Sequence, residues 1–277
     1  MNFTLIPFFL AASVVVDQPD QWIYGPEYVF HASLKQSTSV YWRNHTATMR
    51  CRPAEVDSLL CRFELVTLRA YDKNPSLEFM TIDQPFLIQF SPRGVETLRL
   101  PEMIDDRKLY FIRSIAKSFS VCTDSRESTN TLPEYAPKRN DIASGCTTRI
   151  TILENDEISS KPRNYELQIL SLPDERQPNT TVMIEKNTEH SKRRYNIEQL
   201  TITTDESVNK MYINGKTFRS EAEAQMELKI FTKKHQILVE DVSFMELVNI
   251  ERATEPMPPL NFDHVATLHY DGNLSIV

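Results

Sequence analysis

Short segments in which apolar and polar residues alternate run through most of this chain. Residues 61–71 are the clearest example, and Glu27–Leu34 opens in the same way. A period of two places successive side chains on opposite faces of a strand, so one face of the resulting sheet is buried and the other is wet. Phe86–Phe90 and Val95–Leu100 flank the turn signal Ser91-Pro92-Arg93-Gly94, and they are predicted to form a hairpin. The chain is therefore expected to be mainly β, with antiparallel strands.

The pattern changes between residues 101 and 121. Apolar residues there follow one another in steps of three and four, which describes one face of an α-helix. These residues are Leu109, Ile112, Ile115, Ala116 and Phe119. Asp105 and Asp106 stand near the start of this segment, where the helix dipole favours negative charge.

Strand patterns resume after residue 146, beyond a polar stretch that is predicted to be a surface loop. The expected strands are 147–153, 165–170, 182–186, 195–203, 211–213, 227–232 and 236–242. Asn214-Gly215 is a two-residue turn signal, and Ser220–Leu228 is open to a helical alternative. A helix within a run of antiparallel strands predicts a large antiparallel β-barrel or half-barrel with one central amphipathic helix. The predicted barrel domain spans residues 17–250, followed by a Pro-containing tail at 251–277 with a short strand near 265–270.

The first sixteen residues carry no charged side chain, and the first charge is that of Asp17. This apolar run is short for a membrane-spanning helix, which needs about 20 residues. Small residues near its end and the polar stretch 17–21 fit a signal peptide that is cut between Ala12 and Asp17. We therefore predict a signal peptide at residues 1–16 and a secreted, extracellular protein without a transmembrane segment. The alternative is a buried N-terminal strand or helix.

Four cysteines are present, at positions 51, 61, 122 and 146. An even number in an exported chain predicts two disulfides. Three pairings are possible, and proximity in sequence favours Cys51–Cys61 and Cys122–Cys146 because short loops close at a small entropic cost.

Three Asn-x-Ser/Thr tripeptides follow the predicted leader, and they begin at Asn44, Asn179 and Asn273. Each is a candidate glycosylation site in a protein that passes through a eukaryotic secretory route. A glycosylated asparagine must face solvent, so all three are predicted to lie on the surface.

Three stretches share residues and order with one known family. Trp22–Phe30 contains Trp followed by Gly-x-Glu-Tyr-x-aromatic. Pro85–Val95 is followed by Arg113–Phe119 on the predicted helix, and Ser144–Ile150 places Gly-Cys before a strand. Together these stretches resemble the vitellogenin-type large lipid transfer proteins, and the resemblance covers about residues 22–248.

The resemblance implies the family's N-terminal module, a β-barrel with a central helix. It also implies a Cys122–Cys146 disulfide that closes the loop after this helix. In the family a helical superstructure and two sheets that enclose the lipid follow the module, and neither is found before Val277. The paired cysteines that many members carry are missing around Tyr165. The resemblance therefore implies a docking barrel with at most minor lipid binding.

Nothing in the sequence points to catalysis, a metal or a cofactor. The six histidines form no His-x-x-x-His pair, and no Gly-x-Ser-x-Gly occurs. His264 and His269, five residues apart, would point to opposite faces of a strand. The net charge of −7 and the lack of a basic, aromatic-interleaved stripe argue against a nucleic-acid partner. We therefore expect a non-enzymatic protein without catalytic or metal-binding residues.

One dense basic run, Lys192-Arg193-Arg194, is the candidate binding surface, and Arg50 and Arg52 form a smaller pair. The run could contact the acidic modules of a lipoprotein receptor or be cut by a basic-specific protease. The alternative is a solvated edge strand, since such strands often carry charged residues.

Seven apolar residues could line a lipid cleft, but residues of this kind more often pack a helix against a sheet. They are Phe86, Ile88, Phe90, Leu109, Ile112, Ile115 and Phe119. A barrel that holds a helix leaves little room for acyl chains, and this favours packing.

Three functional hypotheses follow. The first is a secreted lipid-transport protein of the vitellogenin type that docks to a receptor or a larger lipoprotein. The second is an extracellular ligand-binding or modulatory module without lipid cargo. The third is a truncated gene model of a full-length lipid carrier.

Overall fold

The computed structural model describes most of the chain, including sixteen strands and one α-helix. The described residues are 1–16, 18–38, 42–71, 76–80, 82, 84–92, 94–101, 104–120, 146–154, 163–170, 180–195, 200–230, 235–257, 265–269 and 274–275. In the first half the strands are β1 Asn2–Ile6, β2 Leu10–Val14, β3 Pro26–Thr38, β4 Trp42–Glu55, β5 Ser58–Tyr71, β6 Ser76–Met80, β7 Phe86–Ser91 and β8 Gly94–Pro101. After the helix α1, Asp106–Ala116, they are β9 Cys146–Glu154, β10 Tyr165–Ile169, β11 Thr180–Tyr195, β12 Leu200–Ile213, β13 Phe218–Ile230, β14 His235–Arg252, β15 Val265–His269 and β16 Leu274–Ser275.

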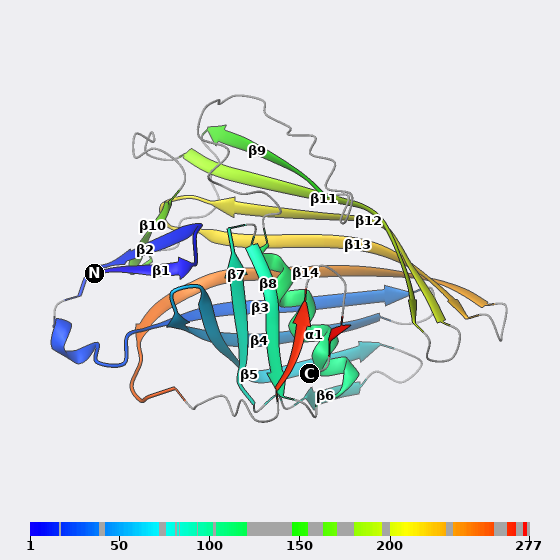
Figure 1. Ribbon diagram of the computed structural model, residues 1–277, viewed down its shortest axis with the longest axis horizontal. Helices are drawn as coiled ribbons and strands as arrows, with labels where there is room; N and C mark the ends of the chain where they lie inside the picture. The colour runs from blue at the N-terminus through cyan, green and yellow to red at the C-terminus, as the bar shows by residue number, and fades with distance from the viewer. Residues whose placement is uncertain are drawn as a thin grey trace.

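A single large antiparallel sheet forms most of the molecule (Figure 1). Its strand order is β16-β15-β8-β7-β5-β4-β3-β14-β13-β12-β11-β9, and β6 pairs with β5 beside this path. The mainly β, antiparallel class predicted from the alternating pattern is confirmed. The prediction of a barrel was wrong in one respect, because among the described strands β9 and β16 do not pair and the sheet is not closed. Closure depends on pairing between distant strands, which alternation within one strand does not report.

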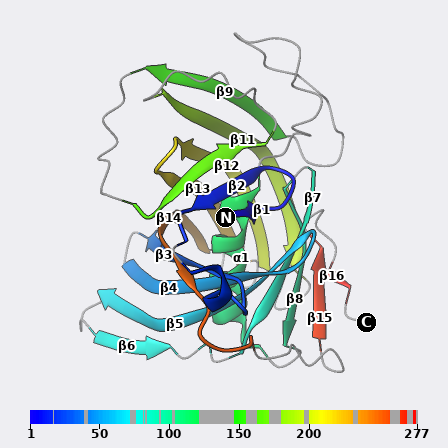
Figure 2. The ribbon, with the colours of Figure 1, turned by 90° about the vertical axis from the view of Figure 1, so that its left-hand side faces the viewer.

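Helix α1 lies in the hollow of this curved sheet, where β3–β5, β7–β8 and β11–β13 surround it (Figure 2). It contacts β3 and β14. Asp105 caps its first turn, and the carboxylate accepts a hydrogen bond of 2.9 Å from the backbone N–H of Lys108. Such a cap satisfies a donor that would otherwise have no partner within the helix. The three- and four-residue spacing of apolar residues thus predicted this element correctly, and the single turn Lys117–Phe119 extends it.

A second, three-stranded sheet covers one end of the curved sheet, with the order β1-β2-β10. Figure 2 looks onto this end, and β1 and β2 cross in front of α1. Both strands come from residues 1–16, the predicted signal peptide. The structure therefore places this segment as a buried strand pair, while its removal on export remains a prediction.

The predicted positions of strands and turns agree with the structure better than the predicted lengths of the strands do. The turn at Asn214-Gly215 joins β12 to β13, and the N–H of Asn214 donates to the carbonyl of Thr217 over 3.0 Å. The helical alternative for Ser220–Leu228 was wrong, because β13 runs through it. The segments 195–203 and 211–213 were predicted to be two strands, but Leu200–Ile213 is one strand. In both regions, pairing with two neighbouring strands overrides a weak local preference.

Candidate functional site

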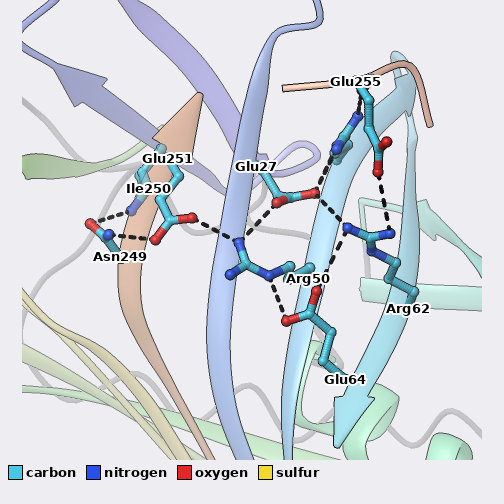
Figure 3. A network of polar contacts seen from close by, with 9 residues as sticks. Glu27, Arg50, Arg62, Glu64, Asn249, Ile250, Glu251 and Glu255 are labelled. Carbon is cyan, nitrogen blue, oxygen red and sulfur yellow. Dashed lines mark hydrogen bonds and ion pairs between the residues drawn. The ribbon is translucent and has the colours of Figure 1, made fainter. Parts of the chain in front are cut away.

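Glu27 lies at the centre of a network of arginines and carboxylates on the outer face of the sheet (Figure 3). Its side chain is only 7 % exposed, and it pairs with Arg50 at 2.9 Å and with Arg52 at 2.8 Å. Arg62 lies 3.8 Å from the same carboxylate. Arg50 reaches further, to Glu64 at 2.8 Å. Glu27 is thus a buried carboxylate whose charge is balanced by nearby guanidinium groups.

Strand pairing brings these distant residues together. β3 lies between β14 and β4, and β4 lies between β3 and β5. Cys51 faces Tyr28 on one side and Cys61 on the other, and all three belong to the apolar core. Since side chains alternate along a strand, the residues next to Cys51 point to the opposite face. Arg50 and Arg52 therefore meet Glu27 outside the core, next to the Cys51–Cys61 disulfide.

The end of β14 and the chain that follows it cover part of this network. Arg50 contacts Glu251 at 2.8 Å, and Arg52 donates a hydrogen bond to the backbone carbonyl of Glu255. The N–H of Ala253 donates to the carbonyl of Gly25 over 3.0 Å. Two residues later than Glu255, Met257 packs on a small apolar cluster of Leu60 and Leu87. Residues 253–257, which we call the outer strap, therefore cover the Glu27–Arg52 pair, whose two side chains are at most 7 % exposed.

The network shifts the pKa values of two of its members, Arg50 and Glu251. Hydrogen bonding from Arg50 lowers the pKa of Glu251, against a smaller opposing effect of burial. Burial lowers the pKa of Arg50, but the hydrogen bonds to Glu251 and Glu64 outweigh this and raise the pKa overall. Both shifts favour the charged forms, so the groups stay ionised and paired. This arrangement suits a structural clamp that joins β3, β4, β5 and β14.

The concave face contains different titratable groups, each largely surrounded by protein. Asp241 on β14 is 7 % exposed, and burial raises its pKa to about 6, against a hydrogen bond from Gln36. Burial lowers the pKa of Lys186 on β11 to about 8. Burial, with Arg43 and Arg107 nearby, also lowers the pKa of His45, whose ring lies 5.6 Å from that of Phe111. Among the described residues, no group of three or more His, Cys, Asp or Glu side chains is placed to hold a metal ion.

The seven apolar candidates for a lipid cleft pack helix against sheet. Six of them are at most 2 % exposed, and Leu109 packs on the same core at partial exposure. Phe119 makes ring contacts with Phe30, Phe90 and Phe218, which come from β3, β7 and β13. These residues therefore form the core that fixes the helix inside the sheet.

The basic run Lys192-Arg193-Arg194 lies on β11, opposite residues 203, 202 and 201 of β12. The structure describes the backbone of these three residues but not their side chains. Arg50 and Arg52, the smaller basic pair, are engaged in the network around Glu27. The network itself was missed by the sequence analysis, and the alternation of Arg50, Cys51 and Arg52 was the signal that could have revealed two opposite faces.

The structure places some of the predicted modification sites. Cys51 and Cys61 are disulfide-bonded, as predicted. Cys122 lies outside the described residues, so its predicted pairing with Cys146 stays a prediction. Asn44 is on β4, next to the inward-facing His45, and its partly exposed side chain points to the outer face. Asn179 and Asn273 lie outside the described residues.

Comparison with known proteins bears on the fold. The chain is similar to a solved structure of lipovitellin, described as a study of lipid–protein interactions, with a TM-score of 0.50 and 11 % sequence identity. The similarity covers 87 % of this chain and 27 % of that chain. No family model matches the sequence, and no curated protein matches it. The fold is therefore lipovitellin-like. Within the described residues, no helix has the length and apolarity needed to cross a membrane.

Proposed function

We propose that this chain is a secreted, non-enzymatic protein of lipid transport, in which the lipovitellin-like sheet is a docking module. The observation that carries this proposal is the match of the fold along 87 % of the chain. The three stretches that resemble vitellogenin-type proteins support the same assignment independently.

The interior of the sheet favours docking over bulk carriage of lipid. Helix α1 and the aromatic residues around Phe119 fill the hollow, where acyl chains would otherwise lie. A close-packed protein core has few voids larger than a water molecule, so it excludes a large ligand. The module would therefore act through its surface, on a receptor or a larger lipoprotein, with little lipid of its own.

The basic run on β11 is the proposed contact for acidic receptor modules. Three ion pairs with an acidic module, at the roughly 0.5 kcal/mol typical of solvent-exposed pairs, would change affinity by about tenfold. We expect the triple variant Lys192→Gln, Arg193→Gln, Arg194→Gln to bind such modules about tenfold more weakly in a pull-down. A matched control neutralises three exposed cations on other strands, Lys35, Arg69 and Arg149. Equal binding by both variants and the unmodified protein would exclude this contact.

Extraction of the purified secreted protein for lipid tests the transport part of the proposal. Phospholipid in stoichiometric amount, absent from a control secreted protein purified in parallel, supports a role in lipid transport. A lipid-free monomer that still binds a receptor favours the second candidate, an extracellular module without lipid cargo. The filled hollow around α1 is the observation that supports this second candidate.

A further inference from the structure

The strand pair β1–β2 is seated on the end of the sheet by two kinds of contact. β2 pairs antiparallel with β10, with Leu10 opposite Ile169 and Val14 opposite Tyr165. Burial alternates along β2, since Leu10, Ala12 and Val14 are at most 3 % exposed and Ser13 is exposed. This segment thus lies on its neighbour as an added strand with one apolar face.

The seat is made by residues that come later in the chain. Tyr28, Tyr165, Leu167 and Ile169 belong to the same apolar cluster as β1 and β2, and the most exposed of the four is only 8 % exposed. The hydroxyl of Tyr28 donates to the carbonyl of Thr4 over 2.6 Å. The ring of Trp22 stacks on that of Phe3, with 5.5 Å between their centroids.

The same sixteen residues fit a signal peptide, whose predicted cut lies between Ala12 and Asp17. Every residue of the seat follows this cut. Removal of the leader would therefore uncover Tyr28, Leu167 and Ile169, together with one backbone edge of β10.

We propose that residues 1–16 are removed on export, and that the vacated seat then binds an extended, apolar segment of a partner protein, which pairs with β10 as β2 does here. We call this surface, formed by Tyr28, Tyr165, Leu167, Ile169 and the vacated backbone edge of β10, the β10 seat. This inference concerns a protein partner and does not depend on whether the chain carries lipid.

Backbone chemistry favours a strand over a lipid as the occupant. Leu167 donates its N–H to Gly215 on one side of β10, and Leu170 donates its N–H to Phe9 on the other side, at 2.9 Å in both cases. N–H and C=O groups on the second side lose their partners when residues 1–16 leave. An acyl chain cannot satisfy these groups, whereas an added strand satisfies them and gains specificity from alternate side chains.

The first measurement is the N-terminal sequence of the secreted protein. The expected mature chain starts between residues 13 and 18. A secreted chain that starts at Met1 would overturn the proposal, because β1–β2 would then occupy the seat permanently.

The second measurement uses a fluorescent peptide of residues 9–18 as a probe of the β10 seat. Saturable binding to the mature secreted protein is expected from fluorescence anisotropy. The variant peptide Leu10→Asp, Ala12→Asp places two carboxylates on the buried face and should lose at least about tenfold in affinity. The matched control Ala11→Asp, Ser13→Asp carries the same charge on the other face, and its affinity should change by less than about threefold.

Three outcomes would count against the β10 seat. Absence of saturable binding and an equal loss for the two charged peptides would each overturn the proposal. The third is displacement of the peptide by phosphatidylcholine vesicles. The control is another protein–peptide complex formed by strand addition, which must stay intact at the same lipid concentration. Selective displacement would identify lipid as the occupant. In the protein, Leu167→Asp should abolish peptide binding, whereas the exposed neighbour Gln168→Asp should not, with circular dichroism to confirm that both variants fold.

Discussion

The two faces of the large sheet are both buried where β3 and β4 meet, but by opposite chemistry. On the concave face, Tyr28 and Cys51 join an apolar core that α1 covers. On the outer face, Glu27 and Arg52 form an ion pair that the outer strap covers. A sheet that is covered on both sides can hold charged residues in its interior, provided that they are paired and hydrogen-bonded. Burial of a charged residue in this fold therefore does not identify a reactive site.

The largest effect is expected from the concave face. Phe119→Ala removes a ring that contacts three other phenylalanines from three strands. It should lower the free energy of unfolding by about 4–5 kcal/mol, because the side chain is fully buried and the cavity cannot collapse easily. Urea unfolding followed by fluorescence measures this loss. The exposed Leu238→Ala is the control, with an expected change within about 0.5 kcal/mol.

The outer face should respond nearly as strongly to the loss of a single charge. Arg52→Gln leaves the Glu27 carboxylate short of a partner at 7 % exposure, and the expected loss is about 3 kcal/mol. Lys210→Gln breaks a partly exposed pair with Glu185 and should change stability by at most about 1 kcal/mol. If the two variants unfold at the same urea concentration, the clamp interpretation is wrong.

Asp241 provides a pH test of the concave face. Its pKa is raised from the ordinary 3.8 to about 6, so the folded state binds more protons than the unfolded state between these values. Stability should therefore fall as pH rises from about 4 to 6, by up to about 3 kcal/mol. Asp241→Asn should flatten this slope in urea titrations at a series of pH values. The exposed Glu240→Gln, on the same strand, should keep it.

The smallest effect concerns the helix that covers the concave face. Asp105→Ala removes the N-cap and should cost about 1 kcal/mol of stability. Asp105→Asn retains a good cap residue and should restore most of this loss in thermal unfolding. A full loss in the Asn variant would indicate that the ion pair with Lys108, at 3.5 Å, matters more than the cap.

Local patterns in the amino-acid order were enough to predict the strand class, the hairpin at 86–100, the helix and the turn at Asn214-Gly215. These features depend on neighbours within a few residues of one another, through side-chain alternation, helical spacing and turn preferences. The Cys51–Cys61 disulfide belongs to the same group, because a tight turn joins its two strands and the cysteines are only 10 residues apart.

Tertiary structure decided the features that join distant segments. The joining of the two halves into one sheet, the pairing of Glu27 with Glu251 and the position of the outer strap all depend on β14 pairing with β3, more than 200 residues earlier in the chain. The apolar pattern of residues 1–16 fits both a signal peptide and a buried strand, since both need the same side chains. Only the pairing of β2 with β10 reveals a seat there, because backbone hydrogen bonds between distant strands leave no mark in local sequence.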